Sequence, residues 1–196
     1  TYPFLDTRFK VGQTVEVTWD VANTDVAPVN CKLVNIYGSF SSALRNDDPN
    51  LVPLALNVPN DGSQMINIPN KISNLFRIVI KAADNIFLTS SKLPSRIEAA
   101  TVPAIYVEPT QKYLEICQPE VGIITFNTEG LAGYAGDVTF ELVSGLPSGA
   151  TATFDNATIA AGGSSTLSIV NANVVGNQNG TLLIKAFGQG VDTVTW

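Results

Sequence analysis

The stretch QTVEVTWDV, residues 13–21, decides the fold, because apolar and polar side chains alternate along it without a break. Its apolar residues stand at positions 15, 17, 19 and 21, with Glu16, Thr18 and Asp20 between them. Successive side chains of a β-strand point to opposite faces of the sheet. The stretch is therefore predicted to be a strand with one buried and one exposed face.

The same alternation recurs through the first half of the chain. It predicts further strands at residues 31–37, 51–58, 64–68, 76–82 and 86–90. Asp61-Gly62, within PNDG at 59–62, is a strong turn signal because glycine tolerates positive φ. Strands 51–58 and 64–68 are therefore predicted to pair as an antiparallel hairpin.

The second half repeats short strands and turns at regular spacing. Strands are predicted at residues 105–108, 113–117, 122–127, 137–143, 151–154, 165–170, 181–187 and 191–196. Residues 71–74 suggest at most a single helical turn. Short strands at this spacing indicate an all-β fold class, with two tandem immunoglobulin-like antiparallel β-sandwich domains.

The length of 196 residues suits two sandwiches of about 100 residues each. Residues 92–103 contain two prolines and no sustained alternation, so we predict domains at 1–102 and 103–196. The first residues, Thr1-Tyr2-Pro3, do not resemble the start of a signal peptide. We therefore expect an excerpt of a larger protein whose targeting signals lie elsewhere.

Composition argues against several classes of function. The chain contains no histidine, which removes the commonest general base and metal ligand and with it Ser-His-Asp and zinc-histidine chemistry. The net charge is −6 and the basic residues are scattered, so no nucleic-acid partner is expected. No run approaches the about 20 apolar residues of a membrane helix, so no membrane insertion is expected. We expect a monomer that has no cofactor and is not an enzyme.

The two cysteines fall one in each predicted domain, at Cys31 and Cys117. A disulfide within either domain is excluded, because each would need two. A bond between the domains is one possibility, as in exported proteins. Two reduced, largely buried thiols are the preferred alternative.

Four aspartates are candidate calcium ligands, because oxygen-rich loops bind Ca²⁺. Asp20 and Asp25 lie in WDVANTD, and Asp47 and Asp48 lie in RNDDPN. The preferred alternative is that they are strand-end and turn residues, since aspartate and asparagine favour turns. No other metal site is predicted.

Several separated motifs of the first domain together resemble a known family. They are VGQTVEVTWDVANTDVAPVNCKLVNI (11–36), LALNVPNDGSQMINIPN (54–70) and RIVIKAADNIF (77–87). They resemble the immunoglobulin-like module that lies C-terminal to the catalytic domain of secreted bacterial reprolysin-like zinc metalloproteases. The second domain's GLPSGATATF (145–154) and GGSSTLSI (162–169) resemble bacterial immunoglobulin-like repeats.

The resemblance implies structural rather than catalytic roles. Trp19 would be a core residue and VPNDGS (58–63) a turn, while the protease signature HExxH is absent here. The expected function is a non-catalytic spacer, or a substrate- or surface-binding region, of a larger secreted metalloprotease. The alternative is a carbohydrate- or protein-binding fragment of a bacterial cell-surface adhesin that carries no protease domain. Either implies a secreted or cell-surface location and an unidentified protein or polysaccharide partner.

Overall fold

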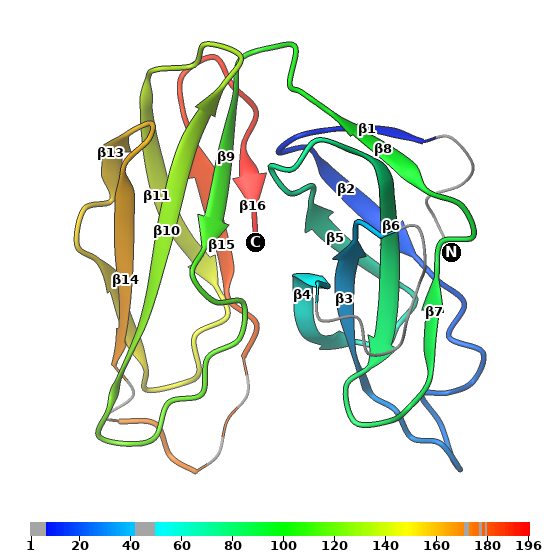
Figure 1. Ribbon diagram of the computed structural model, residues 1–196. Helices are drawn as coiled ribbons and strands as arrows, with labels where there is room; N and C mark the ends of the chain where they lie inside the picture. The colour runs from blue at the N-terminus through cyan, green and yellow to red at the C-terminus, as the bar shows by residue number, and fades with distance from the viewer. Residues whose placement is uncertain (1–6, 42–49, 171–172, 177, 179) are drawn as a thin grey trace. The chain divides into compact units, whose positions relative to one another are not determined.

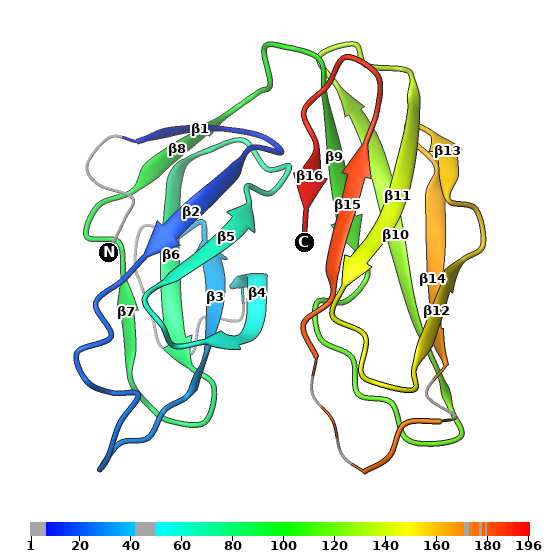
Figure 2. The ribbon, with the colours of Figure 1, turned by 180° about the vertical axis from the view of Figure 1, so that it is seen from behind.

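The computed structural model describes residues 7–41, 50–170, 173–176, 178 and 180–196. Within these ranges all regular secondary structure is β-strand, in sixteen strands (Figures 1 and 2). The chain divides into two compact units, Thr1–Ala99 and Ala100–Trp196. The fold class is therefore all-β, with two tandem immunoglobulin-like sandwich domains. The described residues contain no helix with the length and apolar character needed to cross a membrane.

Unit 1 contains two sheets. The larger has the strand order β1-β8-β6-β3-β4, with β7 paired to β6, and the smaller consists of β2 and β5. The β1–β8 pair is parallel, while the other pairs are antiparallel. The strands are β1 (Arg8–Lys10), β2 (Thr14–Thr18), β3 (Leu33–Ser39), β4 (Val52–Pro59), β5 (Ser63–Asn67), β6 (Ser73–Ala82), β7 (Leu88–Ser90) and β8 (Ser95–Glu98).

The predicted hairpin between 51–58 and 64–68 is wrong. Strand β4 pairs with β3, and β5 pairs with β2, so the Asp61-Gly62 turn carries the chain from one sheet to the other. Gly62 has the positive φ, +100°, that the turn signal requires. The turn itself was therefore predicted correctly. Burial, and not the turn, decides which strands β4 and β5 pair with. Val58 and Ile66 are both buried, although their strands belong to different sheets.

The core of unit 1 contains three of the four apolar residues that the opening stretch predicts to be buried, whereas Val21 is half-buried. Val17 is 1% exposed and Trp19 8%, whereas Glu16 and Thr18 are exposed. Phe9 of β1 and Phe76 of β6 meet edge to face with ring centroids 6.0 Å apart. The predicted helical turn at 71–74 is wrong, since β6 already begins at Ser73.

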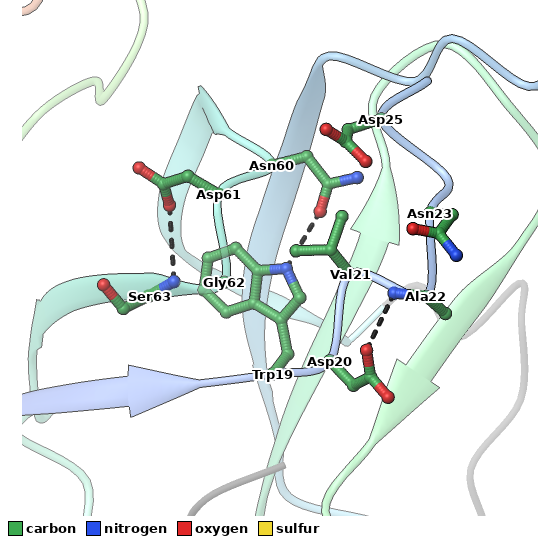
Figure 3. Close-up of a pocket in the computed structure, with 10 residues that line it drawn as sticks. All are labelled: Trp19, Asp20, Val21, Ala22, Asn23, Asp25, Asn60, Asp61, Gly62 and Ser63. Atoms are coloured by element: carbon green, nitrogen blue, oxygen red, sulfur yellow. Dashed lines mark hydrogen bonds between the residues drawn. The ribbon is translucent and has the colours of Figure 1, made fainter. Parts of the chain in front are cut away.

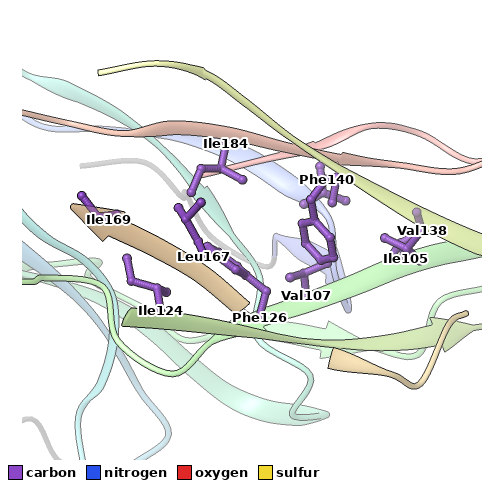
Figure 4. Packing of buried hydrophobic residues seen from close by; sticks show 11 residues of the cluster. Ile105, Val107, Ile124, Phe126, Val138, Phe140, Leu167, Ile169 and Ile184 are labelled. Atoms are coloured by element: carbon purple, nitrogen blue, oxygen red, sulfur yellow. The ribbon is translucent and has the colours of Figure 1, made fainter. Parts of the chain in front are cut away.

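Unit 2 consists of two four-stranded sheets. Their orders are β12-β14-β10-β9 and β13-β11-β15-β16. Buried side chains from both sheets form one core around Phe126, Phe140 and Leu167 (Figure 4). The strands are β9 (Ala104–Pro109), β10 (Val121–Leu131), β11 (Asp137–Ser144), β12 (Thr151–Phe154), β13 (Thr158–Ala160), β14 (Ser164–Val170), β15 (Leu183–Phe187) and β16 (Val194–Thr195).

The strand predicted at 113–117 is absent. Leu114 and Ile116 lie in irregular structure and pack against the core of unit 2. A Cβ placed on Gly122 would lie 2.3 Å from Ile116 Cδ1, so the segment is seated directly over β10. The alternation in the sequence therefore reflects apolar packing without strand pairing.

Candidate functional site

The candidate site is an open depression on unit 1, where the loop after β2 meets the turn between β4 and β5 (Figure 3). Two segments far apart in the sequence line it. They comprise Trp19, Asp20, Val21, Ala22, Asn23 and Asp25 from the loop, and Asn60, Asp61, Gly62 and Ser63 from the turn.

Asn60 holds the two segments together. Its Oδ1 accepts a 2.9 Å hydrogen bond from Trp19 Nε1, and its Nδ2 donates to Thr24 Oγ1 at 3.0 Å and to the Cys31 carbonyl at 3.1 Å. Asn60 is only 6% exposed, so these bonds satisfy an amide that would otherwise be costly to bury. The indole and the amide together form a fixed floor beneath the loop.

The loop backbone has an unusual conformation. Ala22 has φ 52° and Asn23 has φ 58°, both in the left-handed region that non-glycine residues seldom adopt. Asp20 supports this conformation, because its Oδ1 accepts a 2.8 Å hydrogen bond from the Ala22 N–H. Such conformations persist when the surrounding structure holds them, and they cluster at functional sites.

Two of the predicted calcium ligands, Asp20 and Asp25, line the same depression. Asp61 also lines it, although its sequence context does not mark it as a ligand. Its position directly before Gly62 marked a turn, but not which loop that turn would meet. Asp47 and Asp48 lie outside the described residues.

The carboxylates of the depression are partly engaged with backbone. Asp20 accepts from Ala22, and Asp61 Oδ1 accepts a 3.3 Å hydrogen bond from the Ser63 N–H. Among residues that the structure describes, no group of three or more acidic, cysteine or histidine side chains is arranged to hold a metal ion. Calcium binding by Asp20 and Asp25 therefore stays a prediction. The depression presents acidic and amide groups to solvent, which suits recognition of a polar ligand.

A second exposed surface lies on unit 2, on the outer face of the β10–β14 pair. Val121 stands directly opposite Val170, and Ile123 follows two residues along β10 on the same face. These side chains are 50%, 38% and 53% exposed, respectively. Thr125 and Thr166 continue this face, with their hydroxyl oxygens 3.3 Å apart. A cluster of exposed apolar side chains on a regular sheet is a candidate contact surface.

The cysteines differ in environment. Cys31 is 1% exposed, and burial, followed by hydrogen bonding to Asp84, raises the pKa of its thiol. Cys117 is exposed, so the expectation that it would be buried is wrong. Its segment lies in irregular structure rather than in the predicted strand. Both are free thiols in the structure.

No protein-family model and no curated protein matches the sequence. Among solved structures, the D0-D1 domain of intimin is 12% identical and has a TM-score of 0.35, over 98% of this chain and 95% of that one. Domains 4 and 5 of the S-layer protein SbsC are 9% identical, also with a TM-score of 0.35, over 87% and 77% of the two chains. Similarities at this level carry no functional argument.

Proposed function

We propose that this chain is a non-catalytic accessory region of a larger secreted protein, which acts as a spacer and as a substrate- or surface-binding element. The observation that carries the proposal is the construction of two compact units, each with a core formed by its own strands. Such units keep their shape without a partner domain, as a spacer requires.

The chemistry of the candidate site supports a binding role. The chain has no histidine, and the depression with Asp20, Asp25 and Asp61 is open rather than enclosed. Enzymes generally accelerate reactions in sites that exclude water and position a general base. The depression offers hydrogen-bonding groups but no such enclosure.

The parent protein that we propose is a secreted reprolysin-like zinc metalloprotease, on the strength of the motifs in residues 11–36, 54–70 and 77–87. The test is to delete this chain from the full-length parent. Activity on a large insoluble protein substrate should fall, while kcat/KM on a short peptide should stay unchanged. Loss of both activities would contradict an accessory role, as would proteolysis by the isolated chain.

The exposed face at Val121, Ile123 and Val170 favours a second candidate, a binding fragment of a cell-surface adhesin without a protease domain. This candidate predicts that the isolated chain binds an insoluble polysaccharide or a cell-surface protein. Ile123→Glu should weaken that binding, and Glu129→Gln on the same strand serves as the control. The residues encoded before Thr1 separate the two parents, since the first requires HExxH and the second requires further sandwich repeats.

A further inference from the structure

Two loops of unit 1 expose aliphatic side chains that its core does not use. In the loop between β2 and β3, Val26 is 45% exposed and Val29 is 40% exposed. In the turn between β6 and β7, Ile86 is 94% exposed. Turns usually contain glycine, proline, asparagine, aspartate or serine. Burial within the fold therefore does not account for these three residues.

The two loops lie at the same end of unit 1. Strand β3 begins there and β6 ends there, and the Ala83 N–H donates to the Leu33 carbonyl at 3.0 Å. Both the loop that precedes β3 and the turn that follows β6 project from the lower end of the unit in Figures 1 and 2. Leu33 is itself 40% exposed. We call the exposed aliphatic side chains at this end the loop-end surface; they belong to Val26, Val29, Leu33 and Ile86.

Backbone hydrogen bonds fix the shape of the β2–β3 loop. The Cys31 N–H donates to the Thr24 carbonyl at 2.8 Å and closes the tip. Within the tip, the Asn30 N–H donates to the Val26 carbonyl at 2.9 Å. A loop that is already ordered loses little conformational entropy when it binds a partner. The tip is therefore preorganised for a contact.

The charge around the loop-end surface is negative. The loops at this end, residues 19–32, 60–62 and 83–87, contain one lysine, Lys32, and four aspartates, Asp20, Asp25, Asp61 and Asp84. The Lys32 ammonium donates to the backbone carbonyl of Asp25 at 2.5 Å, and not to a carboxylate. The ion pairs among the described residues involve none of these aspartates. A complementary partner therefore carries positive charge.

We propose that the loop-end surface docks a protein partner that presents aliphatic side chains beside arginine or lysine. The proposal deepens the binding role proposed above and rests on it. The aliphatic side chains supply the apolar contact, and the surrounding aspartates select a basic partner. A second copy of this chain fits poorly, because two-fold symmetry would oppose the same acidic loops. A bilayer surface fits poorly, because anionic lipids would repel the aspartates.

A labelled hexapeptide of alternating leucine and arginine is the probe, and fluorescence anisotropy measures its binding to the full chain. The background is Cys117→Ser, because an exposed thiol can link copies covalently. We expect a Kd of about 100 µM at low salt, which weakens as salt is added. Peptides with glutamate in place of arginine, or serine in place of leucine, should not bind below about 1 mM. A leucine-arginine peptide that does not bind in this range, or a glutamate peptide that binds equally well, would overturn the proposal.

Neutral substitutions locate the contact. Ile86→Ser and Val29→Ser should each weaken binding about tenfold, because each removes an apolar contact without changing the charge. Ile72→Ser is the matched control and should leave the Kd unchanged. Ile72 is 67% exposed and precedes β6, whereas Ile86 follows it, so the same exchange is made at the opposite end of the strand. Equal effects of Ile72→Ser and Ile86→Ser would overturn the assignment to this surface.

A charge pair tests the choice of a basic partner. Asp25→Asn should weaken binding of the leucine-arginine peptide and reduce its salt dependence, because it removes one carboxylate beside the loop-end surface. Asp192→Asn removes one carboxylate from unit 2 and should change neither quantity. Equal effects of the two substitutions would show that net charge, and not this surface, attracts the peptide.

Binding of the chain to bead-bound denatured casein separates this proposal from the proposed function. If the chain binds casein and Ile86→Ser binds it equally well, the accessory role stands and the loop-end surface is wrong. If the chain binds neither casein nor the peptide, the substrate-binding role itself fails. Binding to vesicles of phosphatidylcholine and phosphatidylserine, or a dimer in sedimentation velocity, that Ile86→Ser abolishes would assign the surface to a bilayer or a second copy and overturn the protein partner.

Discussion

The indole Nε1 of Trp19 donates a 2.9 Å hydrogen bond to Oδ1 of Asn60, which lies 41 residues further along the chain. Trp19 lies within the stretch that decides the fold, and Asn60 lies in the turn that crosses between the sheets. The bond therefore ties the sheet containing β2 to the connection that leaves β4, and it fixes the floor of the depression.

Asn60→Ala should destabilise unit 1 by about 3 kcal/mol, because it leaves the buried Trp19 N–H and Cys31 carbonyl without their partner. The chain has two tryptophans, one in each unit, so Trp196→Phe makes Trp19 the only indole reporter. Urea unfolding followed by fluorescence measures the change. Gln64→Ala, at a partly exposed position of β5, should change stability by less than about 0.5 kcal/mol.

The hydrogen bonds to the Asp155 carboxylate predict that unit 2 loses stability in acid. Its Oδ1 accepts hydrogen bonds from the Thr166 N–H at 2.8 Å and the Asn156 N–H at 2.6 Å, and these lower the pKa of the carboxyl. A folded pKa below the unfolded value gives stability that is present above the unfolded pKa and is lost as pH falls through the folded pKa.

Unit 2 of the parent should therefore lose stability as pH falls below about 4, the ordinary value for aspartate. Asp155→Asn keeps an acceptor oxygen but cannot titrate, so it should flatten this part of the profile. Urea unfolding at stepped pH, read by Trp196 in a Trp19→Phe background, gives the comparison. Asp192→Asn controls for the removal of one negative charge. Equal acid slopes for the parent and Asp155→Asn would contradict the assignment.

Gly188 leaves room for the Tyr134 hydroxyl to reach the Asp137 carbonyl in unit 2. The Tyr134 hydroxyl donates a 2.6 Å hydrogen bond to the Asp137 carbonyl, and a Cβ on Gly188 would lie 2.0 Å from that hydroxyl oxygen. Gly188→Ala should therefore cost about 2 kcal/mol or more in the free energy of unfolding of unit 2.

A double-mutant cycle separates this clash from a general backbone effect. Tyr134→Phe removes the oxygen, so Gly188→Ala should cost less in that background. Part of the cost should remain, because the same Cβ would lie 2.7 Å from the Asp137 carbonyl. Additive effects of the two substitutions would show that the hydroxyl is not what excludes a side chain at position 188.

Alternation predicted individual strands well. The buried positions of the opening stretch, including Val15, Val17 and Trp19, are those that the alternation selects. The strand predicted at 151–154 matches β12 in both bounds. Such strands bury one face and expose the other, so their local sequence contains the information that places them.

Pairing could not be predicted in the same way. A turn at Asp61-Gly62 is compatible both with a hairpin and with a crossing between sheets, and only burial across the whole unit selects the crossing. The same limit applies to the site. Asp20 and Asp25 are close in the sequence, so their carboxylates could be predicted to lie near each other. Asn60 and Asp61 lie beside them only because the sheet topology brings the two segments together.

Thiol labelling should distinguish the two cysteines of the native chain. Cys117 is exposed and should react with a maleimide at once, whereas Cys31 is 1% exposed and has a raised thiol pKa, so it should react only when unit 1 opens. Intact mass spectrometry should therefore show one label early and a second after denaturant is added. Cys117→Ser should abolish the early label and leave the late one. A parent chain that takes up no label until it is reduced would instead support the bond between Cys31 and Cys117 that the sequence left open.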